Sequence, residues 1–556
     1  MNTVHHRSSL QQLAAQCFPD LTEAERKLLV CAESGAQAEC GSPPTRGSSD
    51  DPNNPARGST WGIQRSIRAE VIVWLGANRQ NKRLVHPKGL IVAGATITGR
   101  LDLSALTIPF PLIFFCCYFN DEIRILYSDL FFLCLDGCVI QTSGNARDAI
   151  VGDSVRARAL NVRGTAVNGG MNLRGAGISG NVEFDGTRIL NPHGVALTLN
   201  AARIDSSIFL RNGFSAEGEV NLCGTDIGGA LDCSSATFVS QLGRAIAADD
   251  ARIGGKADLS RSSVSGVISF AAAEIGSDLA FDQADLAAAT VHLERVFIRR
   301  SLFLSQTTFG AGGFLDLSNA SASAIDADQE SWPAPERVDL DGFSYAYLRQ
   351  PDLASRLLKV VRGASIALSK RMNEPQIRAQ PYRQLSKVLG DMGWEKESRR
   401  VLIALEEDRD RQGRLSVWQK ARRLFYRVGV RYGYDPVKPA AITALVAFLI
   451  GWFLVSLGNG AGLMLPKQSS TSASPRTEIE ELSPMLYSLD TLLPIHAFHQ
   501  EESWWPKVED WHWCACLPNH PPWGYLLRWW LSIEIALGWA AIGLIVAGLA
   551  GVVRRE

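Results

Sequence analysis

The chain has 556 residues, of which 46% are hydrophobic and 20% charged, so it can bury a substantial core and does not have the composition of a disordered protein. Lys and Arg (56) nearly balance Asp and Glu (57), which leaves a formal net charge of −1. This balance argues against a protein devoted to nucleic acid, because phosphate binding usually leaves a basic surplus, and we expect no nucleic-acid partner. At about one domain per 150 residues, the length predicts three or four structural units.

The first 84 residues are predicted to hold short helices around a linker. Residues 1–40 form an N-terminal helical segment, in which "DLTEAERKLLV" carries the N-cap and first-turn acids of a helix start. Residues 41–60 are rich in Gly, Ser and Pro, a composition typical of a flexible linker. Residues 61–84 contain an amphipathic stretch, "GIQRSIRAEVIVWLGA", which predicts a capping helix of the kind that an open solenoid end needs. The N-terminus lacks the apolar core of a signal peptide.

A repeated pattern fills residues 85–348. The segments "ITGRLDLSALTI" (97–108), "IGGALDCSSATF" (227–238) and "IGGKADLSRSSV" (253–264) each begin with an apolar residue and two small or polar ones. Apolar residues follow at positions +4 and +6, which lie on the same face of a strand, and small residues suit a tight corner. Since these starts recur every 22 to 26 residues, the sequence predicts a mainly β fold, a right-handed parallel β-helix (solenoid) of about ten coils.

Residues 349–435 lose this pattern and favour helices. A first helix is expected over 352–370, followed by "PYRQLSKVLGDMGW" and "EKESRRVLIALEEDRDR", which together resemble a single tetratricopeptide-type hairpin. One such hairpin is below the usual minimum of about three repeats for a stable repeat domain. We therefore predict a helical adaptor that joins the solenoid to the segments after it.

Two apolar runs, residues 436–458 and 523–553, are predicted to be transmembrane helices that form a hairpin. Residues 439–457 carry no charge and are long enough to cross a bilayer core of about 30 Å. The loop between the runs, residues 459–522, has three basic residues against eight acids, whereas basic residues precede the first run and follow the second. The positive-inside rule then places both termini in the cytoplasm and the loop outside the plasma membrane. The alternative for each run is a buried helix of a soluble domain.

Glu534 interrupts the second apolar run. A carboxylate inside a membrane helix costs a few kcal/mol when it faces lipid, so it is expected to face a pore or a helix bundle, or else to reach the outer interface. The loop segment 483–498, "SPMLYSLDTLLPIHAF", occupies the place where two-helix channels carry a re-entrant pore helix, which makes Asp490 and Thr491 further candidates. The potassium filter motif T-x-G-Y-G is missing from the sequence, and an interfacial amphipathic segment is the alternative.

The same loop holds four candidate transition-metal ligands within nine residues: His512, Cys514, Cys516 and His520. Their spacing departs from the C-x-x-C of common structural zinc sites, and a disulfide, free thiols or pairing with another chain are alternatives. The other nine of the eleven cysteines precede residue 240, in apolar or Gly-rich stretches without regular spacing, which suits a reducing cytoplasm.

No catalytic or cofactor-binding residues are predicted. "GAGISG" (175–180) satisfies the G-x-G-x-x-G dinucleotide pattern, but another repeat strand follows it where that motif needs a helix. Parallel β-helices include sugar-cleaving enzymes whose acids and bases are scattered along one face. Such a site looks the same in the sequence as solvated surface charges, so enzymatic activity stays an open alternative.

At its repeats the chain resembles bacterial pentapeptide-repeat-like β-helix proteins, through units such as "KADLSRSSV" and "QADLAAATV". Over nearly its full length it is similar to a group of actinobacterial two-helix membrane proteins that are often labelled membrane-associated oxidoreductases. The segments "IRAEVIVWL", "PYRQLSKVLGDMGW", "YGYDP" and "SLDTLLP" carry that resemblance. It implies a membrane architecture and a redox label, but these motifs specify no reaction.

The sequence therefore favours a membrane-anchored cytoplasmic β-solenoid that acts as a protein-interaction scaffold or sensor. Its expected partners are membrane lipid and a protein on the solenoid face, and no cofactor is expected. One alternative is a subunit of a homo-oligomeric two-helix ion channel or transporter gated by the solenoid. The other is the membrane-associated oxidoreductase that the resemblance implies.

Overall fold

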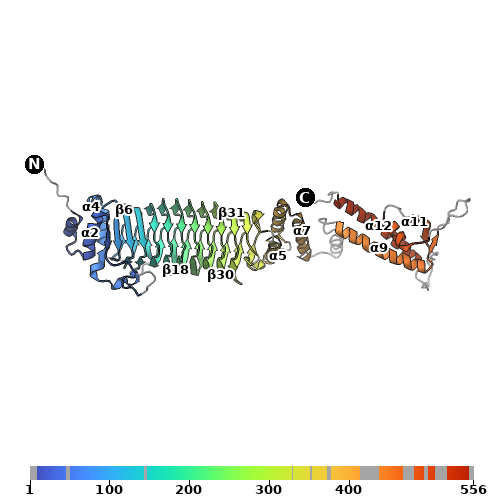
Figure 1. Ribbon diagram of the computed structural model, residues 1–556, viewed down its shortest axis with the longest axis horizontal. Coiled ribbons are helices and arrows are strands. Elements are labelled where there is room, and N and C mark those ends of the chain that lie inside the picture. Colours follow the sequence, from blue (N-terminus) through green and yellow to red (C-terminus); the bar gives the residue numbers. More distant parts are fainter. Residues whose placement is uncertain are drawn as a thin grey trace. The chain divides into compact units, whose positions relative to one another are not determined.

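The computed structural model describes residues 9–44, 50–142, 147–328, 330–350, 353–371, 377–412, 437–466, 481–493, 499–507 and 523–549. The chain divides into two compact units, Met1–Ser398 and Arg399–Glu556. Unit 1 is a stack of parallel strands with helices at its ends, and unit 2 contains long helices (Figure 1). This confirms the predicted fold class, a parallel β-solenoid of about eleven coils followed by helices.

Two long parallel sheets form the solenoid. The 19-stranded sheet contains β1 (Gln37–Glu39), β3 (Leu90–Ala93), β6 (Thr107–Phe115), β9 (Asp129–Asp136), β12 (Arg156–Ala157), β13 (Leu160–Asn161), β16 (Gly177–Ile178), β17 (Val182–Glu183), β19 (Arg203–Ile204), β20 (Ile208–Phe209), β22 (Asp226–Ile227), β23 (Leu231–Asp232), β25 (Arg252–Ile253), β26 (Ala257–Asp258), β28 (Glu274–Ile275), β29 (Leu279–Ala280), β31 (Phe297–Phe303), β34 (Ser321–Asp326) and β36 (Ser344–Leu348).

The 17-stranded sheet contains β2 (Ser66–Arg68), β4 (Thr96–Thr98), β5 (Leu101–Asp102), β7 (Tyr118–Phe119), β8 (Ile123–Arg124), β10 (Val139–Ile140), β11 (Asp148–Val151), β14 (Ala166–Asn168), β15 (Gly170–Asn172), β18 (Arg188–Thr198), β21 (Ser215–Asn221), β24 (Thr237–Ala247), β27 (Ser263–Ser269), β30 (Asp285–His292), β32 (Thr308–Phe309), β33 (Phe314–Asp316) and β35 (Val338–Asp339). Most strands pair in parallel with the equivalent strand of the coil before and the coil after, so identical positions of the repeat stack on one another.

The core consists of columns of apolar side chains inside these coils. The isoleucine that begins each repeat forms one column, which runs through Ile178, Ile204, Ile227, Ile253, Ile275 and Ile298, all buried. Phenylalanines form a second one, with ring centroids 6.4 Å apart for Phe184 and Phe214 and 5.6 Å apart for Phe214 and Phe238. Burying each such side chain contributes about 1.5–3 kcal/mol, so the repeated apolar positions account for the stacking.

The corners of the coils are four-residue turns whose third residue is left-handed. In the turn 103–106, the Leu106 N–H donates to the Leu103 carbonyl oxygen at 3.1 Å, and Ala105 has φ 57°. The equivalent positions in the later coils are Tyr127, Ser154, Gly175, Ala201, Gly224, Asp250, Ala272, Arg295, Asn319 and Gly342, each with positive φ. Because few side chains adopt this conformation freely, small and polar residues dominate these positions.

A second corner is lined by glycines that stack from coil to coil. Gly228, Gly254 and Gly276 occupy the same place in three successive coils, and the Gly254 N–H donates to the Ile227 carbonyl oxygen at 2.7 Å. A Cβ added to Gly254 would clash with the carbonyl oxygen of Gly228, and one added to Gly276 would clash with that of Gly254. In these three coils the corner is therefore closed to any side chain, which explains their "IGG" and "IGS" segments.

The N-terminal end of the solenoid is covered by the helices α1 (Leu10–Cys17), α2 (Glu23–Ser34), α3 (Ala69–Ala77) and α4 (Arg79–Leu84). The first strand, β1, lies inside the segment for which the sequence predicted helix alone, and it pairs with β3. Residues 66–68 are a strand, so the amphipathic helix begins only at Ala69. The segment predicted to be a linker contains the 3-10 helix η1 (Pro55–Thr60), whose Gly58 carbonyl oxygen accepts a 3.0 Å hydrogen bond from the Thr96 hydroxyl. A further 3-10 turn, η2, spans Ile63–Arg65.

The C-terminal end of the solenoid carries a 3-10 turn, η3 (Pro335–Arg337), and the helices α5 (Leu353–Arg371) and α6 (Gln380–Asp391). Helix α7 (Glu395–Gln412) follows in sequence, and the boundary between the two units falls within it. Two glutamines of α6 satisfy the backbone of the last coil. The Gln380 amide donates to the Phe343 carbonyl oxygen at 3.1 Å, and the Gln384 amide donates to that of Tyr345 at 2.5 Å. Gln380 also accepts from the Gly342 N–H at 2.9 Å. These bonds occupy polar groups that a terminal strand would otherwise offer to another chain.

Unit 2 contains two long helices, α9 (Val437–Gly460) and α12 (Trp523–Leu549). Between them in sequence lie a short helix, α10 (Pro484–Leu492), and a single turn, α11 (Gln500–Ser503). The strands β37 (Met464–Pro466) and β38 (Trp504–Pro506) pair antiparallel next to the loop-side ends of the long helices. An apolar cluster of Val455, Met464, Tyr487, Leu527 and Leu531 holds this unit together.

Candidate functional site

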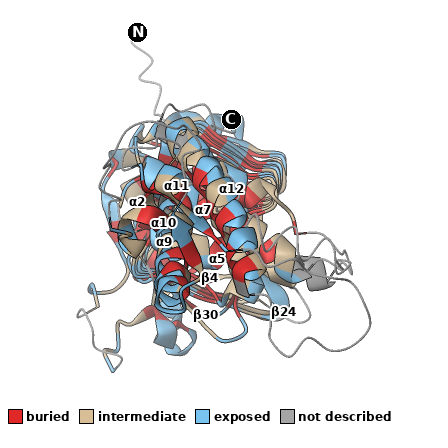
Figure 2. Ribbon diagram, turned by 90° about the vertical axis from the view of Figure 1, so that its right-hand side faces the viewer, coloured by how far each residue is buried: buried red, intermediate tan, exposed pale blue. Residues whose placement is uncertain are grey.

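Helices α9 and α12 are long and apolar enough to cross a membrane over Ala440–Gly460 and Gly524–Ala547. In each, only 22% of the most apolar window is buried within the structure. Large apolar side chains such as Leu449, Phe453 and Trp529 are exposed, and Figure 2 shows pale blue, exposed surface along both helices. A core helix of a soluble domain would instead be mostly buried.

Helix α10 packs against both of these helices, which also pack directly against each other. Its C-terminal residue, Leu492, lies against Gly538, where an added Cβ would clash with the Leu492 carbonyl oxygen. Gly538 is roughly 20 Å along α12 from the end nearest the loop, at a rise of about 1.5 Å per residue. Helix α10 thus reaches about halfway along the helix pair, as a re-entrant segment would.

A buried polar contact joins α10 to both long helices. The Ser488 hydroxyl on α10 lies 2.5 Å from Glu534 Oε1 on α12 and 3.1 Å from the Phe448 carbonyl oxygen on α9. Ser488 and Glu534 are both fully buried, although the structure contains no membrane. Glu534 Oε2 has no hydrogen-bond partner among the described residues. The carboxylate therefore faces the inside of unit 2, between the three helices.

Glycines make room for this arrangement. A Cβ added to Gly451 on α9 would overlap the Glu534 carboxylate, just as one on Gly538 would overlap the end of α10. Small residues at helix contacts are typical of membrane helices, because they let backbones approach closely. Gly451, Gly538 and Ser488 were not among the residues singled out from the sequence, although "FLIGWF" and "IALGWA" carried this signal.

The other candidates on α10 are also buried. Asp490 Oδ2 accepts a 3.2 Å hydrogen bond from the Glu501 N–H, and the Thr491 hydroxyl donates to the Tyr487 carbonyl oxygen at 2.8 Å. Asp490 therefore joins α10 to the turn α11, whereas Thr491 bonds within α10. The candidate ligands His512, Cys514, Cys516 and His520, and residues 494–498 of the loop segment, lie outside the described residues.

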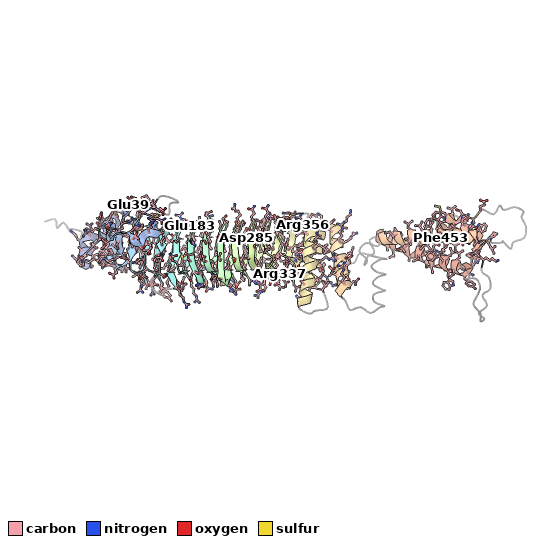
Figure 3. The ribbon with its side chains drawn as sticks, turned by 90° about the horizontal axis from the view of Figure 1, so that it is seen from below. Glu39, Glu183, Asp285, Arg337, Arg356 and Phe453 are labelled. Carbon is pink, nitrogen blue, oxygen red and sulfur yellow. The ribbon has the colours of Figure 1, made fainter. Side chains whose placement is uncertain are left out.

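The acids on the outside of the solenoid mostly have structural partners. Asp258 Oδ1 accepts from the Ser260 N–H at 3.0 Å, and Asp285 Oδ1 accepts from the Ala287 N–H at 3.1 Å, so these carboxylates brace turns. Glu183 lies 3.5 Å from the Arg163 guanidinium of the preceding coil. Figure 3 marks Glu183 and Asp285 on the stacked coils. The carboxylates of this surface thus stabilise the repeat, and these examples show no converging acid and base.

The cysteines of the solenoid behave as core residues. Burial raises the pKa of Cys40 to about 11 and that of Cys134 to about 12, so both remain thiols at neutral pH. A thiol with a raised pKa is a poor nucleophile and a poor metal ligand. These residues support packing, as expected from their apolar surroundings.

One groove on the solenoid has unpaired positive charge. It measures about 670 Å³ and lies over β6, β9, β12, β16 and β19, with Arg156, Arg158 and Ser179 among its lining residues. Neither Arg156 nor Arg158 forms an ion pair with any described residue, and the Arg158 guanidinium lies 4.3 Å from the centre of the Phe131 ring. Asp129 and the ion pair of Arg203 with Asp205 also line this groove, so Arg156 and Arg158 are its cations without an ion pair among the described residues.

No protein-family model, curated protein or solved structure matches this chain. The geometry of the two units is therefore what bears on function. The pair of long apolar helices with α10 packed against both, and the arginine-lined groove, are the two features that distinguish the chain from a plain solenoid.

Proposed function

We propose that the protein is a membrane-anchored β-solenoid, in which α9 and α12 cross the plasma membrane and the solenoid docks a protein on the cytoplasmic side. The exposed apolar faces of the two helices carry this proposal. In water, such surfaces would aggregate, whereas in a bilayer they would contact hydrocarbon. The basic residues that flank the helices support the proposed orientation.

Alkaline carbonate extraction of cell membranes tests the anchor. The native protein is expected to stay in the membrane pellet. A variant with Leu449→Arg and Phe453→Arg is expected to lose membrane integration, because each arginine near the centre of a span costs about 2.5–3.5 kcal/mol. The matched control, Leu449→Ala with Phe453→Ala, should stay in the pellet. Release of the native protein by carbonate would refute the anchor.

For the docking surface, we propose the groove lined by Arg156 and Arg158, with a partner that presents acidic side chains. The support is charge complementarity to two guanidiniums that have no ion pair among the described residues. A photo-crosslinker in place of Ser179 should form a protein adduct in cells. The adduct should disappear when Arg156→Glu and Arg158→Glu are added, and persistence of the same adduct would contradict the acidic-partner proposal.

A second candidate function, an oligomeric pore, is favoured by one observation, that α10 packs against both long helices and reaches about halfway along them. Two helices cannot enclose a pore alone, so this function needs several copies, with the solenoid as a gate. Ion flux through liposomes that hold the purified protein tests it, with the oligomeric state measured in the same detergent. Conductance from a defined multimer would support the pore, and its absence from a monomer or dimer would contradict it.

The redox activity implied by the resemblance to membrane-associated oxidoreductases remains a prediction, as do the pentapeptide-repeat identity and the actinobacterial origin. A flavin or nicotinamide that copurifies with the protein would favour that activity over a scaffold.

A further inference from the structure

We propose that Glu534 is a proton-binding site inside unit 2, and that its bound proton latches α10 to both α9 and α12. The inference goes beyond anchoring and docking. It depends on contacts within unit 2, and it holds whether or not several copies form a pore. The ligand is a single proton, which converts the carboxylate to a carboxylic acid and comes from water.

The Ser488 hydroxyl can donate only one hydrogen bond, although two oxygen atoms lie within hydrogen-bond distance of it. A serine hydroxyl has one proton to donate, yet its oxygen lies within hydrogen-bond distance of two acceptors, Glu534 Oε1 at 2.5 Å and the Phe448 carbonyl oxygen at 3.1 Å. Both contacts are hydrogen bonds at the same time only when Glu534 carries a proton. The acid then donates to Ser488 Oγ, and Ser488 donates to Phe448.

No compensating charge faces Glu534 among the described residues. Glu534 is fully buried, and a buried carboxylate is costly unless a cation or several donors face it. The described side chains of α9 include no ionisable group, and α10 presents Tyr487 and Asp490. Helix α11 adds Glu501 near the same tyrosine. The cation of α12, Arg528, is exposed and stacks on Trp505, with 4.7 Å between its guanidinium and the ring centre.

The second carboxyl oxygen also lies in a place that suits a neutral acid. Glu534 Oε2 and the indole N–H of Trp530 are both buried without a hydrogen-bond partner among the described residues. The carboxyl of Glu534 is close to this indole. A poorly aligned donor costs less free energy at the carbonyl oxygen of a neutral acid than at an oxygen of a charged carboxylate. With Ser488 and this indole as the only neighbouring donors among the described residues, the neutral acid fits the site better than the carboxylate does.

The latch makes the position of α10 depend on pH. Deprotonation would leave a charged group against Gly451 with Ser488 and the Trp530 indole as its donors. Ser488 would then give its one proton to the carboxylate and lose its bond to the Phe448 carbonyl oxygen on α9. Because this bond chain joins α10 to both long helices, loss of the proton would free α10.

Infrared spectroscopy of the full-length protein in lipid nanodiscs tests whether the proton is present. At neutral pH, we expect a carboxylic-acid carbonyl band that moves in deuterium oxide, is lost in Glu534→Gln and persists in Asp490→Asn. In Ser488→Ala, the same band should change frequency, which keeps the test valid if Glu534→Gln does not fold. A band that Glu534→Gln leaves unchanged, or no band in the native protein, would overturn the proposal.

Alkylation of a cysteine at position 491 by N-ethylmaleimide tests the latch itself. Thr491 is buried on α10, so Thr491→Cys should react slowly while α10 is held. In a double variant that also carries Glu534→Gln, position 534 keeps a donor to Ser488 at every pH. Comparing the two variants at the same pH removes the effect of the thiol's own titration on the rate. At alkaline pH, the rate should be about tenfold higher in the Thr491→Cys single variant than in the double variant that also carries Glu534→Gln, as expected for the loss of one buried hydrogen bond. Equal rates at all pH values would overturn the latch.

Discussion

Replacing Gly254 by alanine is expected to destabilise the solenoid by about 3 kcal/mol, at the upper end of the usual cost of overpacking. The added methyl group would clash with the backbone carbonyl oxygen of Gly228 in the preceding coil. That oxygen cannot rotate away as a side chain would, because the stacked strands on either side of the corner fix it. Relief requires two coils to separate, which breaks ladder hydrogen bonds and opens the column of isoleucines. Urea unfolding of the full-length protein in detergent, followed by circular dichroism, measures the change.

Gly177→Ala is the matched control for this substitution. Gly177 also lies in the repeat without a positive φ, and the nearest atom to an added Cβ is Arg156 Cγ at 3.7 Å, an ordinary contact. We expect this variant to unfold within about 0.5 kcal/mol of the native protein. If both variants unfold like the native protein, the coils are less tightly stacked than the contact at Gly228 requires.

Glu25→Gln is expected to loosen the N-terminal cap of the solenoid by about 2 kcal/mol. The buried Glu25 carboxylate accepts four hydrogen bonds: from the N–H, Nε and Nη2 of Arg68 and from the Thr22 N–H, at 2.8 to 2.9 Å. Glutamine offers one oxygen and turns an amide N–H towards two of these donors. Breaking a buried charge pair costs about 3–5 kcal/mol. The value of about 2 kcal/mol expected here is smaller because the Arg68 side chain is 34% exposed.

The same contact predicts how the cap responds to acid. Burial raises the pKa of Glu25, but the hydrogen bonds from Arg68 and Thr22 outweigh it, and the net pKa lies below the ordinary 4.5. A lowered folded-state pKa means that the carboxylate stabilises the cap above pH 4.5 and loses this effect as the pH falls through the folded value. The stability difference between the native protein and Glu25→Gln should therefore shrink below pH 4.5.

Hydrogen exchange of α2 and β2 measures this local stability directly. Glu23→Gln, an exposed acid in the first turn of the same helix, is the control and should change protection by less than about 0.5 kcal/mol. Equal protection of α2 in Glu25→Gln and Glu23→Gln at neutral pH would show that the pair with Arg68 does not hold the cap.

The solenoid could be predicted from the sequence because its pattern is local. An apolar residue, a small pair and the alternation at +4 and +6 lie within a dozen residues, and stacking repeats the same contact in each coil. The first strand, β1, was missed because "QAE" has one buried residue, Ala38, and no repeat signal. The order in residues 55–60 was missed because it depends on contacts of Gly58 with Thr96 and Tyr118, far along the chain.

The arrangement of unit 2 could be predicted only in part. Two apolar runs and a carboxylate are visible in the sequence. The packing of the three helices depends on contacts far apart in the chain, between Gly538 and Leu492, 46 positions away, and between Gly451 and Glu534, 83 positions away. The sequence suggested that Glu534 faces a pore, a bundle or the interface, and the structure places it inside the three-helix bundle of its own chain.

Cysteine labelling in sealed, right-side-out membrane vesicles tests the central claim, that two helices span the membrane with the solenoid on the inner side. The native cysteines serve as reporters, since Cys17 is exposed in unit 1 and Cys514 and Cys516 lie in the loop between the spans. A membrane-impermeant maleimide, applied after a phosphine reductant and read by mass spectrometry, should label Cys514 and Cys516 at once and Cys17 only after permeabilisation. Labelling of Cys17 and Cys514 from the same side of intact vesicles would contradict the proposed anchor.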